Sequence, residues 1–591
     1  MRRGALICYA DLAFGKEETA VLTDMRTETT TVLREAILRA FSDFPLEGLP
    51  GPEALETPPD ATLGDYAFPC FRLSKTLRMA PPAIAQALAQ AVDAPEVATA
   101  QAVGGYVNFF FNRLNFARLT LDSIMTAGER YGGCADAGKT AVLDYSSINI
   151  AKRFHIGHLS TTVIGHSLKR IYRHLGWKTV GINHLGDWGT QFGRMIAAFK
   201  RWGSWEMVEA GGVDALTALY VRFHQEAEEN PALEDEGRGW FRKIEEGDPE
   251  ALETFQRFKD LTLKDASRVY DILGVTFDSY NGEAFFNDKM GRVIDELREK
   301  NLLSESQGAL VVDLEEYRMP PCLIVKSDGA TLYATRDLAA ALWRKDNYHF
   351  DKALYVVAYQ QNLHFQQVFK VLELMGYPWA KDEMEHVAFG MVSYEGQAMS
   401  TRQGNIIYLD ELLTRAREKA LDIIREKSPE LEDPEDVASQ VGVGAVVFTT
   451  LLNNRIKDID FWWDRALNFD GDTGPYTQYT HARCASVLRR ARQNGAEPDI
   501  GALTNDEAQA VLRALARFPE AVRAAQKGNE PSEVTRATLD IAKAFNKYYY
   551  EQRILDDDPA KTRARLDLVR AVKHVIALGL YLIGVRAPEA M

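Results

Sequence analysis

Cysteine is scarce in this chain, and its positions are scattered. The 591 residues contain five cysteines, Cys8, Cys70, Cys134, Cys322 and Cys484, and no two of them form a CxxC pair. Such spacing argues against both a cysteine-based zinc site and a disulfide framework. It favours a reducing compartment, so we expect the cytoplasm.

Long apolar runs and an excess of positive charge are also absent. No hydrophobic stretch approaches the roughly 18 residues of a membrane span, and no small-residue cleavage site follows the N-terminal MRRGALICYADLAFG. We therefore expect neither a membrane anchor nor a signal peptide. The formal net charge of −15 gives no general sign of nucleic-acid binding. A large acidic enzyme can nevertheless carry a local basic face.

The length of the chain predicts several domains. At 591 residues it exceeds the size of one hydrophobic core, and about three to four domains are expected. Residues 1–24 read as an extension of uncertain start, because a clean helical pattern opens only at Met25. Further changes of pattern indicate a mixed α/β unit at 25–132, an α/β core at 133–470 with an acidic helical insertion at about 204–300, and an all-helical bundle at 471–591.

A strand, a helix and a second strand follow one another after residue 140. TAVLDYS and WKTVGINH read as strands, and the segment between them carries apolar residues at helical spacing from Leu159 to Leu175. This order predicts a βαβ crossover and hence a parallel sheet. ALYVVAY at 353 and VAFGMVSY at 387 are interpreted as its later strands. In the first unit, GDYAFPCFRLSKTL predicts a strand and then a helix, and GGYVNFFFN a short strand.

One stretch matches the sequence pattern of a phosphate-binding loop but lacks the structural context that such a loop needs. GCADAGKT, Gly133 to Thr140, matches the P-loop pattern GxxxxGK[ST]. A P-loop must follow a strand and open a helix, so that the helix N–H groups point at the phosphates. Here a helix-like segment precedes the motif and a strand follows it. We therefore predict that it does not bind nucleotide.

Two histidines lie at the start of the crossover helix. His155 and His158 are three residues apart and share a face there, and Gly157 leaves room for a flat group close to the backbone. Parallel sheets place their ligands at the carboxyl ends of strands, and a helix N-terminus favours an anion. The pattern alone also fits two surface histidines. Lys152 and Asn149, which precede it with a further arginine at 153, favour an ATP site.

The same residues carry a resemblance to a known family. HIGH at 155–158 is the signature of class I aminoacyl-tRNA synthetases, and SSINIAKRFHIGHLSTTVIGHSLKR resembles its arginyl form. Further stretches are similar to that family in the same order: GDYAFPCFRLSK and GGYVNFFFN, NHLGDWGTQFG at 183–193, LYATRDLA at 332–339, AMSTRQGN at 398–405 in the place of the KMSKS loop, and GDTGPYTQYTHAR at 471–483. The resemblance spans nearly the whole chain from Met25.

The resemblance implies a fold and an activity. It implies a Rossmann-like class I catalytic domain with a helical insertion, an N-terminal α/β domain that recognises tRNA, and a C-terminal all-α anticodon-binding bundle. The expected reaction is ATP-dependent activation of L-arginine to arginyl-adenylate, followed by transfer to the 3′ end of tRNA(Arg). Mg²⁺ is expected with ATP, and zinc is not. We further expect a monomer without a hydrolytic editing domain, since a site that reads polar groups can reject near relatives directly.

The resemblance also implies roles for individual residues. The residues expected in catalysis are His155, His158, Lys152 and Arg402. Those expected at ATP are His155, Gly157, His158, Lys152, Met391, Val392, Met399 and Ser400. Those expected at arginine are Ser147, Asn149 and His158 at its main-chain end, with Tyr333, Asp337 and Gln361 on its side-chain side.

The arginine-reading positions are chemically suitable. A guanidinium is a planar fork of five donors, and a carboxylate that accepts two parallel N–H bonds reads it in a way that a lysine ammonium cannot imitate. Tyr333 and Asp337 are four residues apart on a predicted helix, so both can face one pocket. Spacing alone also fits a core tyrosine beside a surface charge; the surrounding motif favours the pocket.

The signature loop is depleted of lysine. It reads AMSTR, so neither lysine position of KMSKS is filled by lysine. We expect Lys152 to approach the ATP phosphates from the helix side, while Arg402 or the loop backbone closes from the other side. The two stretches would then be opposite walls of one ATP site. This depletion also suits a family expectation that adenylate formation itself needs bound tRNA.

Contacts with tRNA are less sharply defined by the sequence. In HARCASVLRRAR, the basic side chains of His481, Arg483, Arg489, Arg490 and Arg492 could form one stripe against phosphates, or simply a solvated helix face. The three consecutive tyrosines at 548–550 could stack on bases. They cannot share one helix face, so we expect at least one of them in the core.

Some positions depart from the family pattern, and two rival interpretations follow. Ile148 stands where proline is usual, Ala358 where aspartate is common, and Gln403 where a basic residue is frequent. None of these is an expected arginine-reading position, so we expect activity to be retained. A cysteinyl-type synthetase would need cysteine-rich zinc ligands that the chain lacks. A catalytically silent RNA-binding paralogue is disfavoured by the intact HIGH, Tyr333 and Asp337, although the altered loop is compatible with it.

Overall fold

The N-terminal part of the chain forms a small α/β domain. The computed structural model describes residues 21–327, 333–398, 407–491 and 495–591. An antiparallel sheet of order β1-β3-β2 packs with three helices. Its elements are α1 (Val21–Ala40), β1 (Tyr66–Pro69), α2 (Phe71–Leu77), α3 (Pro81–Ala91), β2 (Ala98–Val103) and β3 (Tyr106–Phe111). The strand and helix predicted in GDYAFPCFRLSKTL are confirmed. The helix predicted from Met25 already includes Val21, the first described residue, which is buried.

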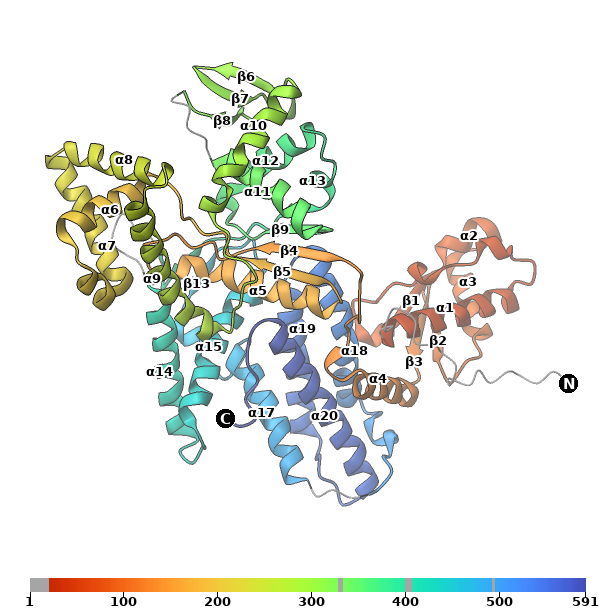
Figure 1. The fold of residues 1–591 in the computed structure, drawn as a ribbon. Coiled ribbons are helices and arrows are strands. Elements are labelled where there is room, and N and C mark those ends of the chain that lie inside the picture. The colour runs from red at the N-terminus through yellow and green to blue at the C-terminus, as the bar shows by residue number, and fades with distance from the viewer. Residues whose placement is uncertain (1–20, 328–332, 399–406, 492–494) are drawn as a thin grey trace.

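A four-stranded parallel sheet forms the centre of the molecule. Its order is β10-β9-β4-β5, and each neighbouring pair is parallel, which confirms the predicted crossover. The strands are β4 (Thr140–Asp144), β5 (Lys178–Ile182), β9 (Lys352–Tyr355) and β10 (Met384–His386). Helices α5 (Leu159–His174), α11 (Tyr333–Tyr348), α12 (Asn362–Leu374) and α13 (Trp379–Asp382) accompany them (Figure 1). The GCADAGKT motif lies between α4 (Arg113–Ala127) and β4, so its reversed context is confirmed.

A largely helical insertion follows β5, and a small sheet comes after it. The helices are α6 (Thr190–Trp202), α7 (Trp205–Glu229), α8 (Ala232–Glu245), α9 (Pro249–Leu273) and α10 (Met290–Glu299). They confirm the predicted helical character of 204–300. An antiparallel sheet of β6 (Leu303–Ser306), β7 (Ala309–Val312) and β8 (Cys322–Val325) was not predicted. Helices α6–α8 and this sheet form two separate lobes above the central sheet (Figure 1).

The stretch VAFGMVSY does not form one strand of the central sheet. The fourth strand, β10, ends at His386, and β11 (Val392–Tyr394) belongs to another sheet with β12 (Gln397–Ala398) and β13 (Ile459–Phe461). The prediction was wrong because Val392–Tyr394 pair with β13 instead of the central sheet, and the Gly390 backbone packs so closely against Lys457 that an added Cβ would lie 2.4 Å from the Lys457 backbone oxygen. Helices α14 (Leu409–Lys427), α15 (Pro434–Leu452) and α16 (Trp463–Ala466) complete this region.

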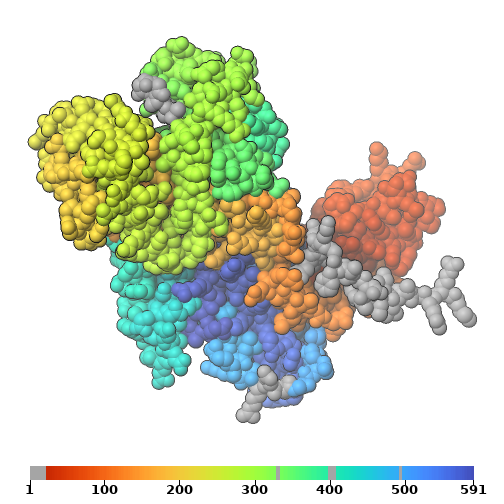
Figure 2. Space-filling model, viewed as in Figure 1, coloured from red at the N-terminus to blue at the C-terminus, as the bar shows by residue number. Residues whose placement is uncertain are grey.

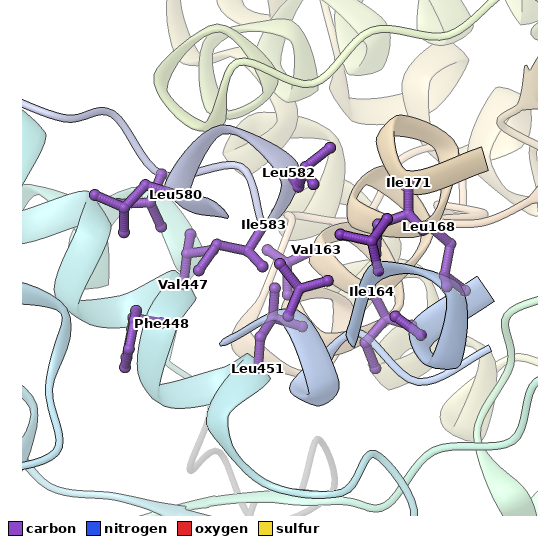
Figure 3. Close-up of a cluster of buried hydrophobic side chains, with 14 of the residues drawn as sticks. Val163, Ile164, Leu168, Ile171, Val447, Phe448, Leu451, Leu580, Leu582 and Ile583 are labelled. Carbon is purple, nitrogen blue, oxygen red and sulfur yellow. The ribbon is translucent and has the colours of Figure 1, made fainter. Parts of the chain in front are cut away.

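The C-terminal region is the predicted helical bundle. It consists of α17 (Gly474–Arg490), α18 (Asp506–Gly528), α19 (Ser532–Glu551) and α20 (Pro559–Leu582). Its core is continuous with that of the central domain, because apolar side chains of α5, α15 and the end of α20 lie together (Figure 3). Ile164, Leu451 and Leu582 in this cluster are at most 2% exposed. Each such side chain contributes about 1.5–3 kcal/mol of burial free energy. This packing fixes helix α5 against α15 and the end of α20.

The N-terminal domain stands out from the body as a separate lobe (Figure 2). A buried ion pair joins it to α18: Arg513 Nε lies 2.6 Å from Asp65 Oδ1, and the Asp65 side chain is only 7% exposed. Asp65 Oδ2 also accepts from the Phe111 backbone N–H, which fixes the carboxylate to the sheet. A cavity of about 770 Å³ lies beside this pair, between the domain and helices α18 and α19.

Candidate active site

The chain adopts unusual backbone geometry directly after β4. Ser146, Ser147 and Ala151 have φ values of 73°, 47° and 62°, a region that non-glycine residues rarely occupy. Strained backbone of this kind collects at functional sites, where the surrounding structure maintains it. Asn149 is held by a bridge to Gly186, which comes from the NHLGDWG stretch after β5. The carboxyl end of β4 is therefore a rigid, irregular platform.

The HIGH residues form a tight turn at the start of α5. His155 caps the 3₁₀ turn Ile156–His158: the Gly157 N–H donates to His155 Nδ1 at 3.1 Å, and the His155 N–H donates to His158 Nδ1 at 3.3 Å. The two ring centroids are 4.0 Å apart. A Cβ on Gly157 would lie 2.8 Å from the His155 ring, so glycine is required here. The predicted shared face of the two imidazoles is confirmed.

Both imidazoles are neutral in this setting. Burial lowers the pKa of His158 from 6.5 to about 3, and the nearby charges of His155 and Lys152 add to the effect. Burial and Lys152 also lower the pKa of His155. At neutral pH they offer N–H donors rather than positive charge.

Lys152 is the available cation beside this turn. Its side chain is exposed, and among the described residues its ammonium forms neither an ion pair nor a hydrogen bond. It lines a cavity of about 240 Å³ together with Asn149, Gly186, Gln191 and Tyr333. Gln191 and the neighbouring Tyr220 were not among the predicted site residues.

Arg153, in contrast, is already engaged. Its guanidinium lies 3.5 Å from the centroid of the Tyr408 ring and forms ion pairs with Asp410, Glu411 and Asp214. These partners raise its pKa against the effect of burial. The expectation that both basic residues before HIGH converge on the ligand is therefore wrong for Arg153, which anchors α14 and the insertion to the site.

The two ends of the signature loop are fixed at different places. On one side, β12 pairs with β11 as a hairpin. On the other side, Tyr408 bridges to His155, the Ile156 N–H donates to the Ile407 backbone oxygen at 3.0 Å, and the Leu409 N–H donates to that of Phe154 at 2.9 Å. Residues that directly follow the loop thus lie against the HIGH turn. Four predicted positions lie outside the described residues: Met399, Ser400, Arg402 and Gln403.

The predicted arginine-reading pair lies at the start of α11. Tyr333 is 64% exposed and lines the cavity with Asn149 and Lys152, whereas Asp337 does not. The Asp337 carboxylate is partly buried, and its Oδ2 lies 2.6 Å from His364 Nε2. Burial opposes ionisation, but the hydrogen bond from His364, with the charges of His364, His184 and Arg344, keeps the pKa of Asp337 below its ordinary value.

A second carboxylate shares this electrostatic environment. Burial raises the pKa of Glu283 to about 7, and the charges of Asp337 and Asp187 reinforce the shift. Arg336 Nη1 lies 3.4 Å from Glu283 and opposes it. Glu283 was not predicted, because YNGEAFF contains no recognisable spacing of acidic residues. Two acidic side chains near one another favour a cationic ligand.

A buried ion pair stabilises the irregular backbone at the carboxyl end of β4. Arg344 Nη2 lies 2.8 Å from Asp144 Oδ2, and both side chains are almost fully buried. Asp144 Oδ1 accepts a hydrogen bond of 3.0 Å from the Ser147 hydroxyl, which orients that side chain. Arg344 also contacts His184 Nδ1 at 3.3 Å. The network joins Ser147 to the helix that carries Asp337.

Three further expected nucleotide and arginine positions, Gln361, Met391 and Val392, lie outside this cavity. Gln361 is exposed and forms the N-cap position of α12. Met391 is 40% exposed, and its N–H donates to Asp458; Val392 begins β11. None of these three residues lines the cavity of Lys152 and Tyr333.

In the helical bundle, the predicted basic stripe is only partly formed. His481 is 2% exposed and contacts the Pro588 backbone oxygen, so it does not belong to the surface. Arg489 donates to the Glu589 backbone oxygen, and Arg490 is exposed. Arg483 contacts Asn546 and lies over the rings of two tyrosines at 479 and 549. Arg492 lies outside the described residues.

The triple tyrosine is divided as predicted. Tyr548 is fully buried, while Tyr549 and Tyr550 are 37% and 91% exposed. One ring therefore belongs to the core of the bundle and two remain at its surface, of which Tyr549 lies beside Arg483.

Comparisons with known families match nearly the whole chain. The model for tRNA synthetases class I (R), catalytic domain, matches residues 120–463. The Arginyl tRNA synthetase N terminal domain matches residues 29–111, and the DALR anticodon binding domain matches residues 477–591. The part of the chain that the structure describes contains no helix long and apolar enough to cross a bilayer.

Individual relatives and structures agree with these matches. An arginine–tRNA ligase of Alkaliphilus metalliredigens is 52% identical, covering 91% of this chain and 96% of that protein. One of Clostridioides difficile is 50% identical, covering 96% of this chain and 100% of that protein. The arginyl-tRNA synthetase of Thermus thermophilus matches with a TM-score of 0.79 at 27% identity, covering 96% of this chain and 100% of that one. This chain belongs to the arginyl-tRNA synthetase family of class I aminoacyl-tRNA synthetases.

Proposed function

We propose that this protein is an arginine–tRNA ligase. It activates L-arginine with ATP and passes the arginyl group to the 3′ end of tRNA(Arg) for protein synthesis. The observation that carries the proposal is the cavity at the carboxyl end of β4, where Asn149, Lys152 and Tyr333 meet one helical turn from the Asp337 carboxylate. Family membership and about 50% identity to arginine–tRNA ligases support the same reaction.

The first step needs alignment rather than a base. The arginine carboxylate attacks the α-phosphorus of ATP; a carboxyl oxygen–phosphorus bond forms, and the bond to the pyrophosphate oxygen breaks. The nucleophile is already an anion, so no proton has to be removed. Catalysis then depends on holding the reactants in line and on stabilising charge as it develops on the phosphate oxygens. ATP enters as its magnesium complex.

The residues around the HIGH turn supply complementary contacts to ATP. His155 and His158 act as neutral N–H donors to phosphate oxygens, since burial lowers the pKa of both. The Lys152 ammonium supplies the positive charge. Gly157 leaves the turn open for close approach of the nucleotide, with Met391, Val392, Met399 and Ser400 on the opposite wall. Arg402, or the loop backbone around it, closes over the phosphates.

Arginine lies with its side chain toward α11. The Asp337 carboxylate accepts hydrogen bonds from the guanidinium, and Tyr333 and Gln361 flank the same side. Asn149, Ser147 and His158 hold the main-chain end. Because the Ser147 hydroxyl donates to Asp144, its oxygen lone pairs are free to accept from the α-ammonium. Discrimination against lysine follows from the fork-shaped donor pattern of arginine.

Transfer of the arginyl group requires tRNA to span the molecule. We assign residues 25–132 to recognition of tRNA outside the anticodon, residues 133–470 to catalysis and residues 471–591 to the anticodon. Arg483, Arg489 and Arg490 are the proposed phosphate contacts in α17. The enzyme acts as a cytoplasmic monomer, and adenylate formation requires bound tRNA because the loop carries so little positive charge.

A single aminoacylation assay tests the function. The purified protein is incubated with ATP, magnesium, total tRNA and labelled arginine, lysine or cysteine in separate reactions. Arginine alone should be attached to tRNA; attachment of another amino acid, or of none, would refute the proposal. ATP–pyrophosphate exchange with and without tRNA tests the tRNA requirement, which equal rates would reject.

A further inference from the structure

Among the described residues, only one oxygen of the Asp337 carboxylate has a hydrogen-bond partner. His364 Nε2 lies 2.6 Å from Asp337 Oδ2. No described residue donates a hydrogen bond to Asp337 Oδ1. The two side chains are 28% and 25% exposed, and one oxygen is held by His364 while the other has no donor among the described residues. A guanidinium that binds this carboxylate therefore finds one acceptor open and a hydrogen-bond donor already on the second.

The His364 imidazole is fixed by its surroundings. It lies in the first turn of α12, directly after the 3₁₀ turn Tyr359–Gln361. Its ring packs edge-on against Phe365 at 5.3 Å, and Phe365 is 7% exposed and in turn contacts the Tyr355 ring at 5.2 Å. Helices α11 and α12 pack against each other. The donor is therefore placed by the core rather than by a flexible loop.

We propose that His364 is a positioning residue for the arginine side chain: its Nε2–H donor fixes one oxygen of Asp337 and aims the other at the guanidinium. This inference rests on the proposed function, because it assumes that arginine binds at Asp337. His364 itself does not touch the reacting atoms. It orients the Asp337 carboxylate, and its protonation state sets the net charge that the guanidinium meets there.

A protonated His364 carries the same sign of charge as the arginine side chain and would repel it. A neutral imidazole donates from Nε2 and leaves the carboxylate its full charge, whereas a protonated one places a second cation beside the guanidinium. Burial acts to lower the pKa of His364, but the hydrogen bond and charge of Asp337 outweigh it and raise the pKa above 6.5. The bound guanidinium must lower that pKa again, so arginine binding releases a proton from His364.

Several other ionisable groups surround this pair. His386 on β10 lies beside His364, and its own pKa is lowered, first by burial and partly by His364. Around Asp337 lie Arg344 on the same helix and, on other elements, Glu283, His184, Cys322 and Tyr355. His386 Nε2 contacts the Val357 backbone oxygen at 2.9 Å rather than Asp337. His386 is therefore a matched control: an adjacent imidazole without the carboxylate contact.

The test compares His364→Gln, His364→Ala and His386→Gln with the unmodified enzyme. L-arginine is titrated calorimetrically into each full-length protein in two buffers of different ionisation enthalpy, and KM for arginine and for ATP and kcat are measured from about pH 6 to about pH 8.5. The unmodified enzyme and His386→Gln should release a proton on binding, and their KM for arginine should rise several-fold, up to about tenfold, as pH falls across this range.

The two His364 variants should separate donor from charge. Glutamine keeps an N–H donor without titrating, so its KM for arginine should stay near the value of the unmodified enzyme at high pH. As pH falls, that KM should rise less than in the unmodified enzyme, and the remaining rise comes from Glu283, whose pKa of about 7 lies in the same range. Alanine removes the donor, which should raise KM for arginine about tenfold at every pH. KM for ATP should not change in either variant.

Two kinds of failure remain distinguishable. If the unmodified enzyme neither binds nor activates arginine, the proposed function itself fails. If arginine binds and Asp337→Asn weakens it, but His364→Gln releases a proton as the unmodified enzyme does or His364→Ala keeps its KM, then only the role of His364 is refuted.

Discussion

Replacing Lys152 with alanine should slow adenylate formation much more than it weakens arginine binding. Lys152 lines the cavity and has no ion-pair partner among the residues that the structure describes, whereas the adjacent Arg153 forms ion pairs with three carboxylates. At about 4 Å and an effective dielectric constant of about 20, one charge pair is worth about 4 kcal/mol. Because Lys152 is exposed, solvent screening reduces this to about 2–3 kcal/mol. That corresponds to about a 30- to 150-fold loss in kcat.

The assay is steady-state aminoacylation together with ATP–pyrophosphate exchange in the presence of tRNA. Lys152→Arg keeps the charge and should recover most of the rate. Lys139→Ala is the matched control, since Lys139 belongs to the P-loop look-alike and lies over the Trp177 ring 5.3 Å from its centroid. It should leave kcat unchanged. Adenylate formation at the normal rate in Lys152→Ala, or a loss of rate in Lys139→Ala, would refute the reasoning.

Three further predictions follow from contacts elsewhere in the molecule. Arg344→Met leaves Asp144 buried without its partner and should lower the free energy of unfolding in urea by about 3–5 kcal/mol; a loss below about 1 kcal/mol would contradict this. Because the pKa of His158 falls from 6.5 to about 3 on folding, the unfolded chain binds a proton that the folded chain does not. Stability should therefore fall as pH drops below 6.5, by up to about 1.4 kcal/mol per pH unit, and less steeply in His158→Asn, as thermal unfolding at several pH values would test. Asp65→Asn weakens the contact with Arg513 that holds the N-terminal domain, so KM for tRNA should rise about fivefold while KM for arginine stays constant; an unchanged KM for tRNA would count against the domain-positioning role.

Regular spacing of apolar residues predicted the helices and strands of the crossover and of the C-terminal bundle. The β4–α5–β5 crossover and the C-terminal helices follow from regular apolar spacing, and both are present as predicted. The β6–β8 sheet escaped prediction because its strands have only four residues each and little alternation: β6 reads LSES. VAFGMVSY was misassigned because its second half pairs with β13, more than 60 residues away in the sequence.

The residues of the candidate site were also only partly predictable from the sequence. His155, His158, Lys152 and Tyr333 could be selected because their motifs are local in the sequence. Partners that depend on packing could not be selected in this way. His364 and Glu283 approach Asp337 only because α12 and the segment after α9 fold against α11. The buried position of His481 likewise depends on the C-terminal segment around Pro588.

The central claim is that the Asp337 carboxylate binds the side chain of free arginine beside ATP at the HIGH turn. Calorimetric titration of L-arginine into the unmodified enzyme and into Asp337→Asn, each with tRNA and a non-hydrolysable ATP analogue, tests this directly. Loss of a charge-assisted contact predicts at least about tenfold weaker arginine binding in the variant, with affinity for the ATP analogue unchanged. Equal arginine affinity in the two proteins would contradict the claim.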